Sequence, residues 1–355
     1  MRAFRRCVLF FVILILMLYG LSQIVNVLVK SGSDLIQSRN KSIAGIQNEK
    51  EDSVDVLVLG DSESYTSVST VKLWNQYGTA AYIGGQAGQN IQETYYMLRT
   101  ALQNQSPKIV VLETNVLFRE QKGVKGIQEG LIQKANYYFP IFRYHDFWKP
   151  VLFGKEYAEE SFKGFMLRET VESYKGGEYM KETKEKDRIS EMVKHYMDEI
   201  LELCKEKEVS FFLYSAPSPV NYNYRRHNAL KEYAREIGVP YEDLNLKAKK
   251  IGIDWEMDTM DRGDHLNLAG ADKVTEYLAE SGRRRLICRT GGRIRNIHSG
   301  RRRPGNIRRE QNISCKGCIS KRDLFENRKN SIIVSSDFTG GKPCQSLLTD
   351  TMETV

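Results

Sequence analysis

The sequence predicts an α/β fold: a three-layer α/β/α sandwich with a central parallel sheet of about five strands, plus an N-terminal transmembrane helix. Runs of β-branched residues and leucine, such as residues 54–60, are typical of strands that are buried on both faces. These runs alternate with segments of helical periodicity, as in folds built from βαβ units. Residues 7–29 are almost wholly apolar and uncharged, which indicates a membrane span.

The N-terminal segment, residues 1–30, begins with Arg2, Arg5 and Arg6 and continues into this apolar stretch. At about 1.5 Å per residue the stretch would form a helix of roughly 34 Å, enough to cross a bilayer. The arginines predict a cytoplasmic N-terminus, with the rest of the chain on the extracytoplasmic face. A cleaved signal peptide is the alternative, but it would have a shorter apolar region and a small-residue cleavage site. We therefore expect a single-pass anchor in the cell membrane.

Five segments are expected to be strands, and four further segments are expected to be helices. The expected strands are residues 54–60, 78–84, 108–113, 209–214 and 240–244. The expected helices are residues 90–103, 186–207, 225–237 and 267–281. Their order alternates strand and helix, and this alternation predicts a parallel sheet that is covered on both faces.

Local signals set the boundaries of these elements. Gly60 ends the first strand, and a glycine-rich turn at residues 85–89 follows the second. The helix over residues 90–103 ends before Ser106-Pro107, because the residue before a proline avoids the helical conformation. Asn267 is a suitable N-cap for the last helix.

The chain divides into four parts in this interpretation. Residues 1–30 are the anchor, residues 31–52 a polar stalk, residues 53–282 the folded domain, and residues 283–355 a basic tail. Residues 120–185 interrupt the alternation of strands and helices and are rich in aromatic residues. This insertion is either a lid or substrate wall over the sheet edge, or a segment that packs a small core of its own.

The tail, residues 283–355, carries 13 Arg and 4 Lys against 6 acidic residues and contains no Tyr or Trp. Such charge suits a nucleic acid, an anionic polymer or a lipid surface. The abrupt change of composition after a complete fold favours another cause, a shifted reading frame, and we expect the tail to be disordered. Nucleic acid is not the expected partner. Cysteines at irregular spacing, including Cys315 and Cys318, do not predict a zinc site.

Two polar clusters carry the expected chemistry. Asp61-Ser62 follows the first strand, and residues 261–267 (Asp-Arg-Gly-Asp-His-Leu-Asn) precede the last helix. Open α/β folds keep their sites at the carboxyl edge of the sheet. A serine early in the chain, with Asp and His late, is one order in which a hydrolytic triad is assembled. Ser62 is the candidate nucleophile. His265 is the candidate base, since it lies on a loop that leads into a helix.

These motifs resemble the SGNH (GDSL-type) hydrolase superfamily over residues 54–281. The resemblance rests on Gly60-Asp61-Ser62, the glycine turn after the second strand, Asn115 after the third, and the Asp/His block before the last helix. The residues Asp264-His265-Leu266-Asn267 and the anchor are similar to membrane-anchored bacterial members of the DltD-like and alginate O-acetyltransferase-like groups. The resemblance implies a flavodoxin-like order of strands.

The resemblance also implies an oxyanion hole. Its donors would be the backbone N–H groups of Ser62 and Gly85 and the side-chain amide of Asn115. Asp61 is expected to fix the loop by hydrogen bonds rather than to take part in catalysis. No cofactor or metal is expected, because the chain has no P-loop, no GxGxxG motif and no HExxH motif.

The acid that orients His265 is left open by the sequence. The superfamily places an aspartate three residues before its histidine, and here that position is Arg262. Asp261 lies four residues before His265 and Asp264 lies one before it. An extra residue in the loop would let Asp261 serve, and we favour Asp261.

The expected function is that of a serine-dependent esterase or O-acyltransferase that acts on acyl groups, acetyl by preference, of cell-surface carbohydrate. The expected partners are an acylated glycan or another ester, the membrane through residues 7–29, and a membrane-bound acyl-donor protein. The alternative is a non-catalytic surface protein that keeps the fold as a binding or assembly module.

Overall fold

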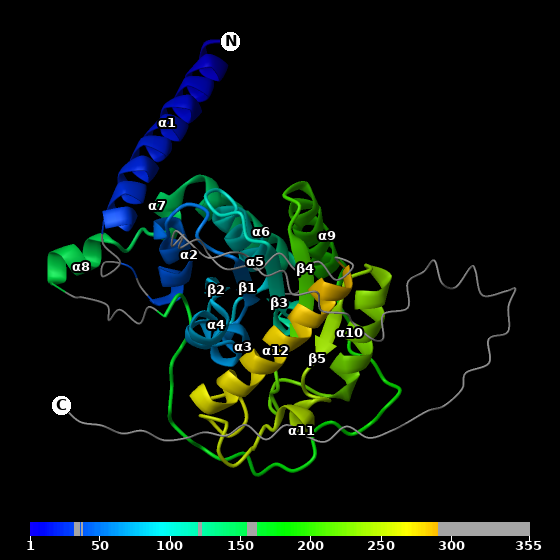
Figure 1. Cartoon of the computed structure of the whole chain (residues 1–355). Helices are drawn as coiled ribbons and strands as arrows, with labels where there is room; N and C mark the ends of the chain where they lie inside the picture. Colours follow the sequence, from blue (N-terminus) through cyan, green and yellow to red (C-terminus); the bar gives the residue numbers. More distant parts are fainter. Residues whose placement is uncertain (32–35, 37, 120–122, 155–161, 290–355) are drawn as a thin grey trace, which may run out of the picture. The chain divides into compact units, whose positions relative to one another are not determined.

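The protein was studied as a computed structural model, which describes residues 1–31, 36, 38–119, 123–154 and 162–289. These residues belong to the unit Met1–Arg309. Five parallel strands form one sheet in the order β2-β1-β3-β4-β5 (Figure 1). They are β1 (Val56–Gly60), β2 (Ala81–Gly85), β3 (Ile109–Glu113), β4 (Ser210–Ser215) and β5 (Tyr241–Asp243). The predicted parallel sheet and its flavodoxin-like order are confirmed.

Helices cover the two faces of this sheet. On one side lie α2 (Ser38–Asn48), α5 (Ile91–Ala101), α9 (Glu191–Glu206) and α10 (Tyr224–Glu236). On the other lie α3 (Ser62–Ser67), α4 (Thr70–Tyr77), α11 (Ala248–Ile251) and α12 (Leu268–Arg289). The remaining helices are α1 (Arg2–Ser31), η2 (Thr114–Phe118), α6 (Val124–Tyr138), α7 (Pro140–Arg143) and α8 (Trp148–Phe153).

Alternate residues of the strands divide the core into two halves. Leu57 and Leu59 of β1 face the cluster that contains α5 and α9, whereas Val58 faces the cluster that contains α4 and α12. This alternation follows from the period-two geometry of a strand. Because both faces are buried, the strands are apolar throughout, which is why they are recognisable in the sequence.

The expected polar stalk, helical or extended over residues 31–52, is helical over residues 38–48, but this helix packs on the domain. Residues 38–48 form α2, which packs on α5 and β2 and buries Ile43, Ala44 and Ile46. The Tyr82 hydroxyl donates to the Ser42 carbonyl at 2.7 Å, and Ser42 Oγ donates to the Ile83 carbonyl at 2.8 Å. The three apolar side chains and these bonds make α2 part of the domain.

The N-terminal helix α1 is long and apolar enough to cross a membrane. Its residues from Phe4 to Leu21 are mostly exposed, but its last turns are joined to the domain. Ser22, Val25 and Val29 are buried, the Asn48 side chain donates to the Val29 carbonyl at 3.1 Å, and α7 packs against the same part of α1.

Two further boundaries differ from expectation. The last helix, α12, continues to Arg289, seven residues past the expected end of the domain at residue 282. The described part of the insertion forms α6, α7 and α8 and then an irregular segment from Phe162 onward. The first seven residues of the expected tail, residues 283–289, are therefore helical and not disordered, whereas the rest of the tail, with the cysteines at 315 and 318, lies outside the described residues.

Candidate active site

Ser62 is the first residue of α3, directly past the carboxyl end of β1. The strand ends at Gly60 with φ +152°, a conformation that favours glycine. A side chain at Gly60 would lie 2.7 Å from Ser64 Cβ and 2.8 Å from Glu113 Cβ, so the turn also needs the missing side chain. Ser62 is 7% exposed, and its backbone N–H lies in the first helical turn, where no intrahelical acceptor exists.

Asp61 holds this turn together. Its Oδ1 accepts the backbone N–H of Glu63 at 3.0 Å, and its Oδ2 accepts the side-chain amide of Asn115 at 2.8 Å. Arg119 Nε also donates to Oδ2, and the Asp61 side chain is fully buried. Because all of these bonds fix the loop and none involves Ser62 Oγ, Asp61 has the geometry expected of a structural residue.

The loop before α12 joins Asp261 to His265. The Asp261 carboxylate accepts the backbone N–H of His265 at 2.6 Å, and its other oxygen lies 2.6 Å from His265 Nδ1. Between them Arg262 and Gly263 have φ +63° and +91°. These two left-handed residues turn the chain back, so an aspartate four residues before the histidine reaches the ring.

Asp264, the other candidate acid, lies farther from the ring. Its Oδ1 is 3.8 Å from His265 Nδ1 and accepts a hydrogen bond from the side chain of Asn221. The same Asn221 amide donates to Glu63 Oε1 at 2.6 Å. Asn221 therefore ties the turn that carries Ser62 to the loop that carries His265.

The other ring nitrogen, His265 Nε2, is buried and has no hydrogen-bond partner. It is therefore not bonded to Ser62 Oγ in this conformation. Catalytic hydrogen bonds are often long without substrate and tighten when it binds. A neutral imidazole whose Nδ1–H is held by a carboxylate presents Nε2 as a proton acceptor.

Glu63 is a further acid in this site, and the sequence analysis missed it. Glu63 is 1% exposed, and its Oε2 has no hydrogen-bond partner. Burial is the main cause that raises the pKa of Glu63 well above the ordinary 4.5, and repulsion from Glu113 and Asp61 raises this pKa further. Burial likewise raises the pKa of Glu113 to about 8. The carboxyl of Glu63 is therefore favoured in its neutral form.

Glu63, Asp264 and His265 are also the one group among the described residues that could hold a metal ion. One ligand atom of each lies within 4.8 Å of the others. The donor set of two carboxyls and an imidazole suits a divalent cation. The Asn221 amide already bonds one oxygen of each carboxyl, which ties the two acids together without a cation.

Gly85 and Asn115 lie at the ends of the two strands that flank β1. Gly85 pairs with Gly60, and a side chain there would lie 2.3 Å from Ser64 Oγ. The Asn115 side chain donates to Asp61 and accepts from Arg226 at 2.7 Å, and this leaves one of its two amide hydrogens for another acceptor.

A segment of the insertion, residues 166–176, lies along the histidine loop, and we call it the strap. The backbone N–H groups of Glu172 and Tyr174 donate to the carbonyls of Thr259 and Trp255 at 3.0 and 2.9 Å. In return, the N–H groups of Arg262 and Leu268 donate to the carbonyls of Glu172 and Arg168 at 2.9 and 2.7 Å. The insertion therefore helps to shape the loop that carries His265.

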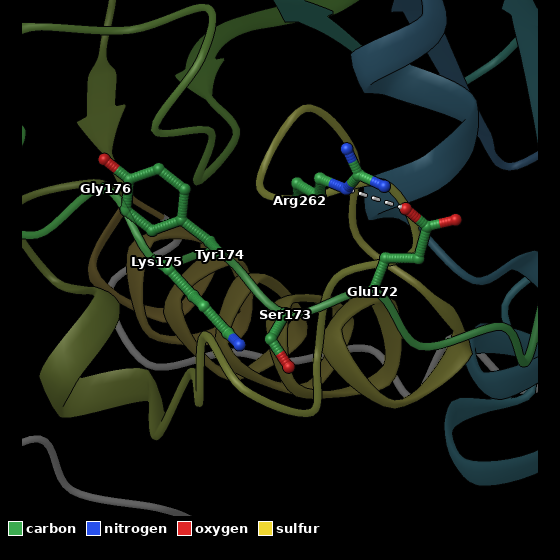
Figure 2. A pocket seen from close by; sticks show the side chains of 6 residues that line it. All are labelled: Glu172, Ser173, Tyr174, Lys175, Gly176 and Arg262. Carbon is green, nitrogen blue, oxygen red and sulfur yellow. Dashed lines mark ion pairs between the residues drawn. The ribbon is translucent and has the colours of Figure 1, made fainter.

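A hollow of about 520 Å³ opens between the strap and this loop. It is lined by Glu172, Ser173, Tyr174, Lys175, Gly176 and Arg262. Figure 2 shows Arg262 reaching from the loop to the Glu172 carboxylate, an ion pair of 3.1 Å. Neither Ser62 nor His265 lines this hollow.

His227 is paired elsewhere in the domain. Its Nδ1 lies 2.6 Å from Asp243 Oδ2, both side chains are buried, and Tyr222 donates to the same oxygen at 2.9 Å. Asp243 ends β5, three strands from β1, and this separation is about 14 Å at about 4.8 Å per strand. His227 therefore packs apart from Ser62.

Two signals for the missed residues were present in the sequence. Glu63 directly follows the candidate nucleophile, and Asn221 lies in the polar run that follows β4. Neither signal predicts the hydrogen bond from Asn221 to Glu63, because the two residues lie more than 150 residues apart in the chain.

No protein-family model and no curated protein matches the chain. Among solved structures it is similar to a Bacteroides fragilis NCTC 9343 protein described as an acylhydrolase, with 16% identity, TM-score 0.36, and coverage of 71% of this chain and 97% of that one. A GDSL-like lipase from Bacteroides thetaiotaomicron VPI-5482 has 13% identity, TM-score 0.33, and coverage of 65% and 88%. An acetyl xylan esterase, AlAXEase, has 16% identity, TM-score 0.23, and coverage of 64% and 98%. Likenesses this weak carry no argument about activity.

Proposed function

We propose that this protein is an esterase or O-acyltransferase of the SGNH type, with Ser62 as nucleophile and His265 as base. One observation supports the proposal above all: Asp261 bonds both the backbone and Nδ1 of His265 and leaves a buried, unpartnered Nε2. A histidine oriented in this way, on a loop beside a serine at the end of a strand, is the arrangement that serine hydrolases use.

In the proposed reaction Ser62 Oγ attacks the acyl carbonyl carbon while His265 Nε2 takes the hydroxyl proton. The bond from the carbonyl carbon to the leaving oxygen then breaks, and Nε2 returns the proton to that oxygen. Water releases the acyl group from Ser62 in an esterase, whereas another hydroxyl does so in a transferase. The backbone N–H groups of Ser62 and Gly85 and the Asn115 amide would bond the oxyanion.

The proposed substrate is an acyl group, acetyl by preference, on cell-surface carbohydrate. The apolar helix α1 supports a location in the cell membrane, with residues 1–6 in the cytoplasm and the domain outside. An acyl-donor protein in the same membrane is the partner that a transferase would need.

The test is a pair of variants of the full chain in detergent, Ser62→Ala and the matched control Ser106→Ala. We expect Ser62→Ala to abolish fluorophosphonate labelling and to lower aryl acetate hydrolysis by roughly 10⁴-fold or more. Ser106 is exposed in the turn before β3 and lies away from both loops of the site, so its variant should keep both. Equal hydrolysis by the two variants would overturn the proposal.

A non-catalytic binding protein with this fold is the second candidate. The observation in its favour is that His265 Nε2 is not hydrogen-bonded to Ser62. Under this alternative the wild-type chain would not react with fluorophosphonate, and Ser62→Ala would leave glycan binding unchanged.

A further inference from the structure

The helices α6 to α8 present an exposed apolar surface. Fifteen large hydrophobic residues are exposed in the described part of the chain that follows α1, and nine of them lie in residues 124–153. Val124, Ile127 and Leu131 on α6 are 63–80% exposed, and Leu152 and Phe153 on α8 are 70% and 74% exposed. Scattered exposed apolar residues are ordinary, but such a concentration in thirty residues marks an interaction site.

The apolar residues of α6 share one helical face. Val124, Ile127 and Leu131 are spaced by three and four residues, so their side chains form a stripe along the helix. On α8, the rings of Trp148 and Phe153 lie 6.4 Å apart with a tilt of 51°, and Trp148 is 43% exposed. We call these six residues, Val124, Ile127, Leu131, Trp148, Leu152 and Phe153, the α6–α8 surface.

The charges around this surface are basic. Lys125, Lys134 and Lys149 are exposed, whereas the two acids of residues 123–154, Glu129 and Asp146, are half-buried. Asp146 is moreover paired with Lys149 at 2.6 Å. Apolar residues with lysines and a tryptophan suit the interface of a bilayer that contains anionic lipid.

The membrane helix is joined to the same helices. The exposed part of α1, from Phe4 to Leu21, is about 27 Å long at 1.5 Å per residue, close to the thickness of a hydrocarbon core. The next residue, Ser22, is buried and accepts the backbone N–H of Ile141 on α7 at 3.5 Å. The helix α7 therefore lies against α1 where α1 leaves the bilayer, and α6 and α8 directly precede and follow α7 in the chain.

We propose that the α6–α8 surface rests on the outer leaflet of the membrane and binds anionic phospholipid. This rests on the proposed anchoring by α1 and goes beyond it, because the body of the protein becomes a second membrane contact. Such a contact would hold the domain in one orientation on the bilayer and limit its reach to ester groups near the membrane surface.

Tryptophan fluorescence tests the proposal, because α1 has no tryptophan and only one of the two exposed tryptophans lies on the α6–α8 surface. Trp148 belongs to the α6–α8 surface, and Trp74 on α4 is 55% exposed outside it. The full chain would be reconstituted in vesicles of phosphatidylcholine and phosphatidylglycerol with brominated acyl chains. We expect quenching in the wild type, loss of most of it in Trp148→Phe, and retention in Trp74→Phe.

The contribution of the lysines around the α6–α8 surface to lipid binding is tested by the double variant Lys125→Glu, Lys134→Glu. This variant should lose quenching of Trp148 in anionic vesicles, with an unchanged melting temperature in detergent. If Trp148→Phe is quenched as strongly as the wild type, the α6–α8 surface does not face lipid and the proposal is overturned. If the chain fails to float with vesicles, both the proposed anchoring by α1 and the proposed lipid contact of the α6–α8 surface are overturned. The proposed esterase activity is tested separately, because hydrolysis of aryl acetate does not depend on flotation or on quenching.

Discussion

Asp261 stands four residues before His265, and the two residues between them with positive φ make this spacing work. Arg262 and Gly263 fold the loop back, so the carboxylate reaches both the backbone N–H and the ring of His265. At the scale of single residues, the site is therefore a set of side chains held by short backbone turns. Asp61 does for the serine turn what Asp261 does for the histidine loop.

Two substitutions distinguish which of the candidate acids, Asp261 or Asp264, orients His265. Asp261→Asn should lower kcat/KM by about 10³ to 10⁴-fold, because an amide can fix the wrong imidazole tautomer and stabilises imidazolium less. Asp264→Asn should lower it less than about tenfold, since Asp264 lies 3.8 Å from Nδ1 and mainly accepts from Asn221. Rates with an aryl acetate measure both. A larger loss for Asp264→Asn would reverse the assignment.

Glu63 predicts a pH dependence of stability. Its pKa is raised in the folded protein, so between pH 4.5 and that higher value the folded state binds more protons than the unfolded state. The stabilisation is complete below pH 4.5 and is lost as the pH rises through the folded pKa. Glu63→Gln removes this titration, and its melting temperature should fall less than that of the wild type between pH 5 and pH 8.

Thermal melts of both proteins at the two pH values make the comparison. Glu232→Gln is the control, since Glu232 is fully exposed and its pKa is lowered by Lys186. An equal fall in melting temperature for the wild type and Glu63→Gln would show that Glu63 is ionised in the folded protein.

At the scale of elements, the strands were predictable and the segments that join them were less so. The strands lie within a few residues of their expected positions because strands buried on both faces are continuous apolar runs. The packing of α2 on the domain escaped prediction because Ile43, Ala44 and Ile46 stand alone in a polar segment. The strap has no side-chain period to detect, since it is held through backbone bonds.

The candidate site divides in the same way. Ser62 lies in a motif within the turn after β1, and Asp261 and His265 lie in a motif within the loop before α12, so each motif can be recognised in a short stretch of sequence. The bonds of Asn221 to Glu63 and Asp264 join two loops that lie far apart in the chain, so no local pattern announces them. Sequence reasoning finds side chains that a motif places, and it misses partners that only the packed sheet edge brings together.

Gly263 tests how the strap supports the histidine loop. Its φ is +91°, and a side chain there would lie 2.9 Å from the Tyr174 ring. Gly252 has a similar φ of +82° but open space around it. Each Gly→Ala change should cost about 1–2 kcal/mol of folding free energy for the backbone conformation. Gly263→Ala alone should also lower kcat/KM, because the clash moves the loop that carries His265.

Denaturant unfolding and aryl acetate hydrolysis of Gly263→Ala and Gly252→Ala measure these effects. Equal activity for the two variants would mean that the strap does not position His265.

At the scale of the whole molecule, the apolar helix α1 and the domain share one core. Ser22, Val25 and Val29 of α1 are buried in the domain, so α1 does not end where the domain begins. A chain that starts at residue 22 should keep the stability of the domain. A chain that starts at residue 31 loses two buried valines, each worth about 1.5–3 kcal/mol, and should melt several degrees lower.

Thermal melts in the same detergent compare these two truncations with the full chain. Identical melting temperatures for the chains that start at residues 22 and 31 would contradict the shared core.

The bonds between the strap and the histidine loop also set the order in which the protein can become active during synthesis. Ser62 and its turn need the chain only as far as Arg119, since Asn115 and Arg119 bond Asp61. His265 takes its place only after the chain has returned to the strap, across nearly ninety residues from Glu172 to Thr259. Such distant pairing forms late, because closing a long loop costs entropy before any contact repays it. Under the proposed mechanism, a chain still leaving the ribosome therefore has Ser62 in place before His265, and it cannot hydrolyse an ester until the loop before α12 has paired with the strap.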